Sequence, residues 1–171
     1  MKKNVIVIVL LAIGLNSFLY GQSDTVYVIK SVDDMSKKTY HYSSRKFLVS
    51  DDDVKVGFAI DVHISNELKL EMITAEMVGI GNCNEKDEII IMLENGETIS
   101  IKSWLEFNCE GEAYFTLKES DLELLRKSPL LKIRMTNGYS HDSFTNYVNK
   151  KDRRYFIQLL YALDRGLVKK K

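Results

Sequence analysis

Several residue types are scarce in this chain of 171 residues, which has one proline, two cysteines, one tryptophan and three histidines. With a single proline and no Ser/Gly-rich tract the sequence shows no linker, and it predicts one domain without an internal boundary. No two histidines lie at the spacing of metal ligands, and the chain has no zinc motif, phosphate-binding loop, GxSxG elbow or dinucleotide fingerprint. The sequence therefore predicts no metal or cofactor and identifies no catalytic residue.

Net charge is also absent, because 24 lysines and arginines balance 24 aspartates and glutamates. No basic stripe interrupts this balance, so the protein lacks the electrostatic field that attracts phosphate backbones. Nucleic acid is therefore not an expected partner. Hydrophobic residues make up 45% of the chain, which is enough for a packed core and argues against disorder.

Long hydrophobic runs are absent except at the N-terminus, where Lys2 and Lys3 precede an apolar run of 11 residues over 5–15. A basic region followed by a short apolar region is typical of a secretion signal. At ~1.5 Å per residue this run covers only about half of a ~30 Å hydrocarbon core. We predict a signal peptide over 1–21 and a mature domain over 22–171. The alternative is an uncleaved anchor, because apolar residues at 18–20 extend the tract.

No cysteine lies near the predicted cut after Gly21, so the mature chain has no site for the acyl chains of a lipoprotein. We therefore expect an exported protein without stable membrane insertion once the signal is removed. Its location would be the periplasm, the cell surface or the extracellular medium.

Alternating apolar residues predict strands along most of the mature chain. The clearest strand covers 54–64, where the apolar residues occupy every second position and the polar ones lie on the opposite face. Asn95 and Gly96 separate two further strands at 88–94 and 97–104, and Asn-Gly is typical of a two-residue type I′ hairpin turn. The remaining predicted strands cover 25–29, 68–80, 113–117 and 131–136.

Two helices are expected among these strands. The first begins with a capping box formed by Ser120 and Glu123 and ends before Pro129. The second follows Asn149 as its cap and ends at Gly166, where glycine suits a left-handed C-cap. Together these elements predict a β-rich α+β domain, in which antiparallel strands form a curved sheet or sandwich and the C-terminal helix packs on one face.

Cys83 and Cys109 are predicted to form a disulfide bond. Export would place them in an oxidising compartment, and within a monomer each has only the other as a partner. The Asn-Gly hairpin register supports this pairing, because it places Cys83 opposite Asn108, the neighbour of Cys109. A bulge near Gly81 or Gly111 would bring the two sulfurs together. The alternative is two buried free thiols.

One polar, turn-rich segment over 137–144 is a candidate binding loop, with Asn137, Tyr139, His141 and Asp142 as its candidate residues. Ser140, His141 and Asp142 are adjacent, and adjacent residues do not form a catalytic relay without unusual geometry. Aromatic residues that could line a carbohydrate or peptide surface, although they more often pack in cores, are Trp104, Phe107, Tyr139, Tyr147 and Tyr155.

His63 lies two residues from Asp61 on the polar face of the strand over 54–64. Period-two spacing puts such residues on one face whatever their function, so an exposed strand face is the favoured interpretation. The alternative is an exported hydrolase or metal-assisted enzyme that uses His63 and Asp61, or the loop containing His141.

Five short stretches of the mature chain carry a resemblance to a known group, and they lie at 77–83 (MVGIGNC), 103–104 (SW), 107–111 (FNCEG), 132–134 (KIR) and 136–138 (TNG). With these stretches the chain resembles small exported hypothetical proteins of Bacteroidota. This resemblance covers much of the mature chain. It implies export and a shared domain, and it brings no activity or catalytic residue to this sequence.

The sequence thus favours a non-enzymatic interaction module of the periplasm or cell surface, with a protein or glycan of the cell envelope as its partner. Export, strands with a polar face and the lack of an assembled catalytic motif support this interpretation. A second binding hypothesis is a secreted inhibitor that acts through an edge strand.

Overall fold

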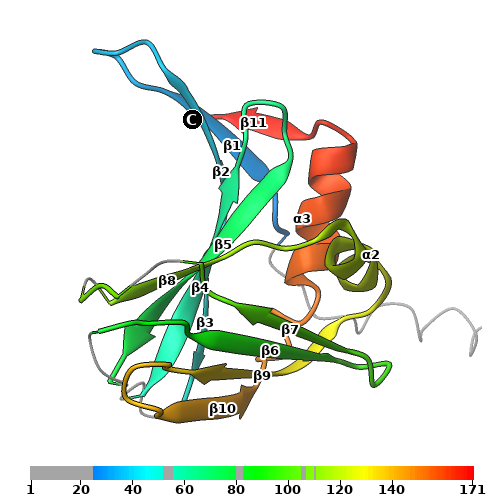
Figure 1. Cartoon of the computed structure of the whole chain (residues 1–171). Coiled ribbons are helices and arrows are strands. Elements are labelled where there is room, and N and C mark those ends of the chain that lie inside the picture. Colours follow the sequence, from blue (N-terminus) through cyan, green and yellow to red (C-terminus); the bar gives the residue numbers. More distant parts are fainter. Residues whose placement is uncertain (1–24, 52–55, 80–82, 105–106, 110) are drawn as a thin grey trace, which may run out of the picture.

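Residues 25–51, 56–79, 83–104, 107–109 and 111–171 are described by a computed structural model of the chain (Figure 1). The predicted signal peptide lies outside these residues, as does Gly81.

Within the described residues, seven strands form a large sheet and four form a small one. The large sheet contains β1 (Val28–Val32), β2 (Thr39–Ser43), β3 (Phe47–Ser50), β4 (Gly57–Ile64), β5 (Leu70–Val78), β8 (Glu112–Phe115) and β11 (Val168–Lys170). The small sheet contains β6 (Glu88–Leu93), β7 (Thr98–Lys102), β9 (Leu130–Thr136) and β10 (Ser143–Tyr147).

Alternation along β4 shows why one face of the large sheet is buried. Phe58, Ile60 and Val62 point into the core, whereas Asp61 and His63 point away from it. The strand pairs antiparallel with β5, so residues that face each other across the two strands share a side of the sheet. The polar-face assignment made from the sequence for the described part of the predicted strand is therefore correct.

Two different layers cover the buried face of the large sheet. The Phe58 ring lies 6.1 Å from the ring of Phe144 on the small sheet. The Phe47 ring lies 4.9 Å from that of Tyr155 and 6.4 Å from that of Phe156, both on helix α3 (Tyr155–Asp164). Figure 1 shows the same division, with the small sheet across one half of the large sheet and α3 beside the other half. Among the described residues, no helix or strand layer covers the opposite face of the large sheet, which we call the open face.

A corner between β2 and β3 bends the large sheet, because both strands pair along the same edge of β4. Helix α3 and the turn before it hold this corner. The Ser43 and Tyr155 hydroxyls hydrogen-bond at 2.8 Å, and Arg45 forms an ion pair with the buried Asp152 at 3.2 Å. Burial raises the pKa of Tyr155, so its hydroxyl stays neutral at ordinary pH.

Both helices are found, but their predicted N-caps are wrong. Helix α2 (Glu119–Lys127) starts after Lys118, whose backbone N–H donates to the Asp121 carboxylate, and not at a box of Ser120 and Glu123. Helix α3 starts after Arg154 rather than Asn149, because the intervening turn brings Asp152 to Arg45.

The C-terminus of α3 agrees with the prediction. Gly166 has φ of 61°, and its N–H donates to the Leu163 carbonyl while that of Leu167 donates to the Ala162 carbonyl. These two bonds are the Schellman pattern that a left-handed glycine permits.

The Asn-Gly hairpin is present, but its turn is not type I′. Of the two turn residues only Gly96 has positive φ, at 89°, and Leu93 faces Glu97 across a three-residue loop. Contacts outside the hairpin favour this turn, because the Asn95 N–H donates to the Ser128 hydroxyl. The predicted register was therefore wrong by one residue on one strand.

The predicted fold class, a β-rich α+β domain with a C-terminal helix on one face, is confirmed. The large sheet is mixed rather than purely antiparallel, because β11 runs parallel to β1, whereas the strand pairs of the small sheet are antiparallel. In the part of the chain described, neither helix has the length and apolar character needed to cross a membrane.

Candidate functional site

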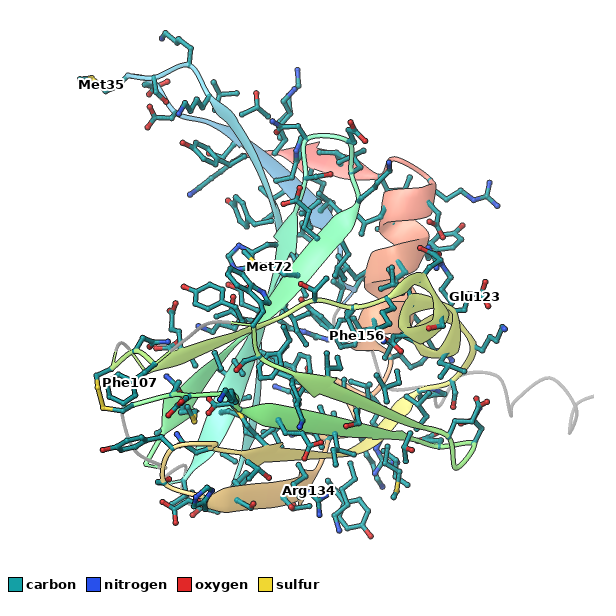
Figure 2. All side chains as sticks on the ribbon, viewed as in Figure 1. Met35, Met72, Phe107, Glu123, Arg134 and Phe156 are labelled. Atoms are coloured by element: carbon teal, nitrogen blue, oxygen red, sulfur yellow. A yellow bond between two sulfur atoms is a disulfide. The ribbon has the colours of Figure 1, made fainter. Side chains whose placement is uncertain are left out.

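A row of aromatic and soft apolar side chains crosses the open face of the large sheet. We call it the aromatic row, and it consists of Tyr42 on β2, His63 on β4, Met72 on β5, Tyr114 on β8 and Trp104. Strand register brings these residues to one face, because Tyr42 faces His63, His63 faces Met72, and Tyr114 faces Thr74 beside them. Figure 2 shows Met72 on the open side of the sheet, away from the core that contains Phe156.

Three rings of the row follow one another at similar spacing. The Trp104 and Tyr114 ring centroids are 5.9 Å apart with their planes tilted by 52°. The Tyr114 and His63 centroids are 6.3 Å apart with a tilt of 41°. Trp104 is 56% exposed and His63 is also exposed, so solvent reaches much of this apolar surface. Large exposed aromatic side chains of this kind are typical of contact surfaces.

Hydrogen bonds fix two members of the row. The His63 ring Nε2 lies 2.5 Å from the hydroxyl oxygen of Thr74, which is buried beside it. The Tyr114 hydroxyl donates to the Glu112 carboxylate at 2.7 Å. These bonds restrict the ring orientations, so less side-chain freedom remains to be lost when a ligand binds.

An open groove of about 980 Å³ adjoins the row where β2 diverges from β4. It lies between the β1–β2 hairpin and the turn that joins β4 to β5. Its lining carries two lysines (Lys30 and Lys38) and two acidic residues (Asp61 and Glu71), so the charges of the lining balance. The rest of the polar lining comes from Thr39, Tyr40, Tyr42, Ser65, Asn66, His41 and His63.

Asp61 and His63 both line this groove, together with His41. They do not form a relay in the structure, because His63 bonds to Thr74 and the Asp61 carboxylate accepts the N–H of Val62 at 2.8 Å. Among the described residues, no group of three histidine, cysteine or acidic side chains could hold a metal ion.

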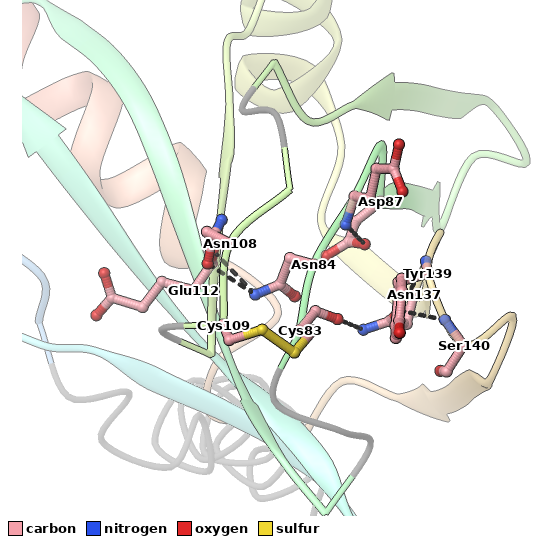
Figure 3. The surroundings of a disulfide bond; sticks show 10 residues. Cys83, Asn84, Asp87, Asn108, Cys109, Glu112, Asn137, Tyr139 and Ser140 are labelled. Atoms are coloured by element: carbon pink, nitrogen blue, oxygen red, sulfur yellow. Dashed lines mark hydrogen bonds between the residues drawn. A yellow bond between two sulfur atoms is a disulfide. The ribbon is translucent and has the colours of Figure 1, made fainter.

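The disulfide between Cys83 and Cys109 is confirmed (Figure 3). It joins the two segments in which the chain crosses between the sheets, from β5 to β6 and from β7 to β8. Asn84 and Asn108 bond to each other through both backbone N–H groups, at 2.7 and 3.0 Å, so the neighbouring cysteines face each other directly. The extra residues that allow this register lie between Lys102 and Asn108, not at Gly111.

The predicted binding loop packs beside this disulfide, and its Asn137 has a structural role. The Asn137 side chain is fully buried, accepts the N–H groups of Tyr139 and Ser140, and donates to the Cys83 carbonyl at 2.8 Å. His141 and Asp142 are exposed, and His141 has φ of 64°. The structure therefore leaves Tyr139, His141 and Asp142 accessible and removes Asn137 from the candidate ligand contacts.

Asp87 is a buried carboxylate that the sequence did not single out. One of its oxygens accepts the N–H of Gly138 at 2.8 Å and that of Glu85 at 3.3 Å, while no described group bonds to the other. Burial raises the pKa of Asp87 against the opposing effect of these two hydrogen bonds. Gly138 passes so close to the Glu85 carbonyl that a Cβ at this position would overlap it.

Of the aromatic residues that the sequence suggested for a surface, all but Tyr155 are exposed. The Phe107 and Tyr139 ring centroids lie 5.1 Å apart near the disulfide, with their planes tilted by 60°, and Tyr147 lies under Lys132. Tyr42 and Tyr114 were missed. Tyr114 could have been found from the predicted strand over 113–117, because alternation places it on the face opposite to Ala113 and Phe115.

Comparison of the chain with protein-family models, with curated proteins and with solved structures gave no match.

Proposed function

We propose that this protein is an exported interaction module that binds a component of the cell envelope through the aromatic row and the groove beside it. The uncovered aromatic row is the observation that supports the proposal. The other face of the same sheet is covered by the small sheet and α3, whereas this face keeps an exposed tryptophan beside ordered polar groups. Aromatic side chains with polar neighbours are enriched where proteins bind their partners.

Export is part of the proposal and is tested separately. The basic and apolar N-terminal regions and the disulfide support it. The measurement is the intact mass of the protein from cell fractions. A periplasmic or extracellular chain that begins near Gln22 is the expected result, and a full-length chain confined to the cytoplasm would contradict it.

Hydroxyl-radical footprinting tests the binding face. The purified protein is oxidised with and without envelope extract from its source, and oxidation is measured at each aromatic residue by mass spectrometry. We expect the extract to protect Trp104 and Tyr114. Tyr161 serves as the internal control, because it is 57% exposed on α3, away from the open face. Equal protection of Trp104 and Tyr161, or protection of neither, would contradict the proposal.

A hydrolase remains the second candidate function, because the groove brings Asp61, His63, His41 and Glu71 to one place. Its test is a screen of the protein against ester, glycan, peptide and phosphoester substrates, with and without divalent metals. An activity that His63→Ala or Asp61→Asn abolishes would support it. No turnover, or turnover that both variants retain, would remove it.

A further inference from the structure

We infer that the ligand of the aromatic row is a single, soluble and uncharged glycan chain, an inference that rests on the proposed function above. Hexose rings have faces lined with C–H groups and edges lined with hydroxyls. The C–H faces pack on aromatic rings, and the hydroxyls bond to planar polar side chains. The open face supplies both kinds of contact. The neighbouring rings of Trp104 and Tyr114 offer aromatic surface, and the Glu112 carboxylate, which accepts the Tyr114 hydroxyl, offers a planar polar group.

The tilt of the rings favours a single chain over a solid surface. Binding to a crystalline polysaccharide needs aromatic rings in one plane, so that all of them touch a flat face. Here the planes are tilted by 52° between Trp104 and Tyr114 and by 41° between Tyr114 and His63. A separate chain can turn from one unit to the next and follow these planes.

The charges of the site favour an uncharged chain. The groove lining has two basic and two acidic residues. On the same sheet face, Lys46 forms an ion pair with Glu76, so the positive charge of this ammonium group is already compensated. An anionic polysaccharide would need an excess of positive charge to repay the desolvation of its acidic groups, and the lining offers none.

The structure offers less to a polypeptide. Addition of a peptide strand needs free backbone groups at a sheet edge, but at β8 the Tyr114 carbonyl already accepts the N–H of Trp104 at 3.2 Å. Docking of an amphipathic helix needs an apolar groove, and the apolar side chains of the lining, Val62 and Ile64, are buried. A proline-rich peptide that packs on aromatic rings is the remaining rival, and the experiment includes it.

The test uses the full chain, expressed with its own leader and purified after export. Trp104 is the only tryptophan of the sequence, so its fluorescence reports directly on the face. The probes are a glycan array with neutral and anionic chains, soluble β-1,4-linked glucose and N-acetylglucosamine oligomers, microcrystalline cellulose, and proline-rich peptides. We expect a neutral soluble glycan to shift the Trp104 emission, and we expect cellulose to retain no protein.

Matched variants locate the binding. We expect Trp104→Ala and Tyr114→Ala each to weaken glycan binding at least about tenfold, measured by calorimetry, which is the range of an interface hot spot. Tyr161→Ala removes an equally exposed ring from α3 and should leave the affinity unchanged. Circular dichroism of each variant checks that the fold is retained.

Each other outcome decides against the inference. Suppose that peptides shift the Trp104 emission of the unsubstituted protein and bind more weakly to Trp104→Ala, while glycans do neither. The glycan inference is then wrong and the proposed function stands. Binding of anionic glycans or cellulose alone would also overturn the inference. If no probe binds and envelope extract leaves Trp104 unprotected, or if all binding survives both variants, the inference and the proposed function both fail.

Discussion

The disulfide end and the open face of the large sheet use polar side chains in opposite ways. At the disulfide end, Asn84, Asp87 and Asn137 are buried and bond to backbone groups of neighbouring segments. On the open face, Trp104 and His63 are exposed, and the groove beside them is lined by polar groups. The first region uses buried polar groups to order its loops, whereas the second leaves surface available to a ligand.

This contrast shows that a polar residue in a turn-rich segment is not by itself a sign of a binding site. Asn137 lies in the most polar segment of the chain, yet its side chain organises the backbone of residues 138–140. Buried polar groups of this kind are costly unless they are hydrogen-bonded, so their removal should cost stability. Replacement of exposed residues on the open face should cost little stability.

Gly138→Ala should have the largest effect, because the new Cβ would overlap the Glu85 carbonyl and the backbone would have to move. We expect a loss of about 4–5 kcal/mol in the free energy of unfolding, or failure to fold, as measured by urea denaturation. Gly96→Ala is the control. Its Cβ would meet nothing within 4 Å, so only the left-handed strain of about 1–2 kcal/mol should appear. Equal losses in the two variants would contradict the close approach at Gly138.

Replacing both cysteines, in Cys83→Ser/Cys109→Ser, should lower the free energy of unfolding by about 3.5 kcal/mol, the chain-entropy value for a loop of this size. Hydrogen exchange separates a local effect from this loss in the whole domain. Amides near 83–87 and 137–142 should lose more protection than the global loss explains, whereas those of β1 and β2 should lose no more than that amount. An equal loss along the whole chain would show that the disulfide stabilises the domain through the unfolded state and does not hold this end in particular.

The sequence predicted the elements that follow regular patterns. Strict alternation in β4 gave the correct buried face, and Gly166 gave the correct end of α3. Elements without clear alternation were missed, and they are β2, β3, β10 and β11. In β2 the sequence TYHYS offers no apolar face, because one of its faces belongs to the open side of the sheet.

Contacts between distant segments explain the errors that remained. The type I′ turn was a sound local prediction, but the Asn95 N–H donates to Ser128 and the Glu94 N–H donates to the Pro129 carbonyl. The aromatic row could not be assembled from the sequence, since it depends on the register of four strands. The disulfide could be predicted because that inference required only two cysteines and the expectation of an oxidising compartment.

Asp87→Asn tests the buried carboxylate through its pH dependence. The folded protein raises the pKa of Asp87 above its unfolded value, so the folded state binds the proton more tightly, and stability falls as pH rises through the folded pKa. Asparagine can still accept the Gly138 N–H, but it carries no charge. We expect the variant to gain stability relative to the natural protein between about pH 4, near the ordinary aspartate pKa, and neutral pH, in urea titrations at several pH values. A stability difference that is constant with pH, or that falls as pH rises, would show that Asp87 is not held in this way.

Trp104→Ala should have the smallest effect on stability, within about 0.5 kcal/mol, since Trp104 is 56% exposed and its ring packs beside that of Tyr114. Chemical denaturation followed by far-ultraviolet circular dichroism measures this without the lost fluorophore. The same variant is expected to lose the glycan binding proposed above, so stability and binding should separate at this residue. At the disulfide end, loss of a buried polar group should instead cost stability, because the loops depend on the hydrogen bonds of these groups. A loss of 2 kcal/mol or more on Trp104→Ala, well outside the range for surface substitutions, would mean that the ring is a structural cover for β8, and the functional contrast between the two regions would no longer hold.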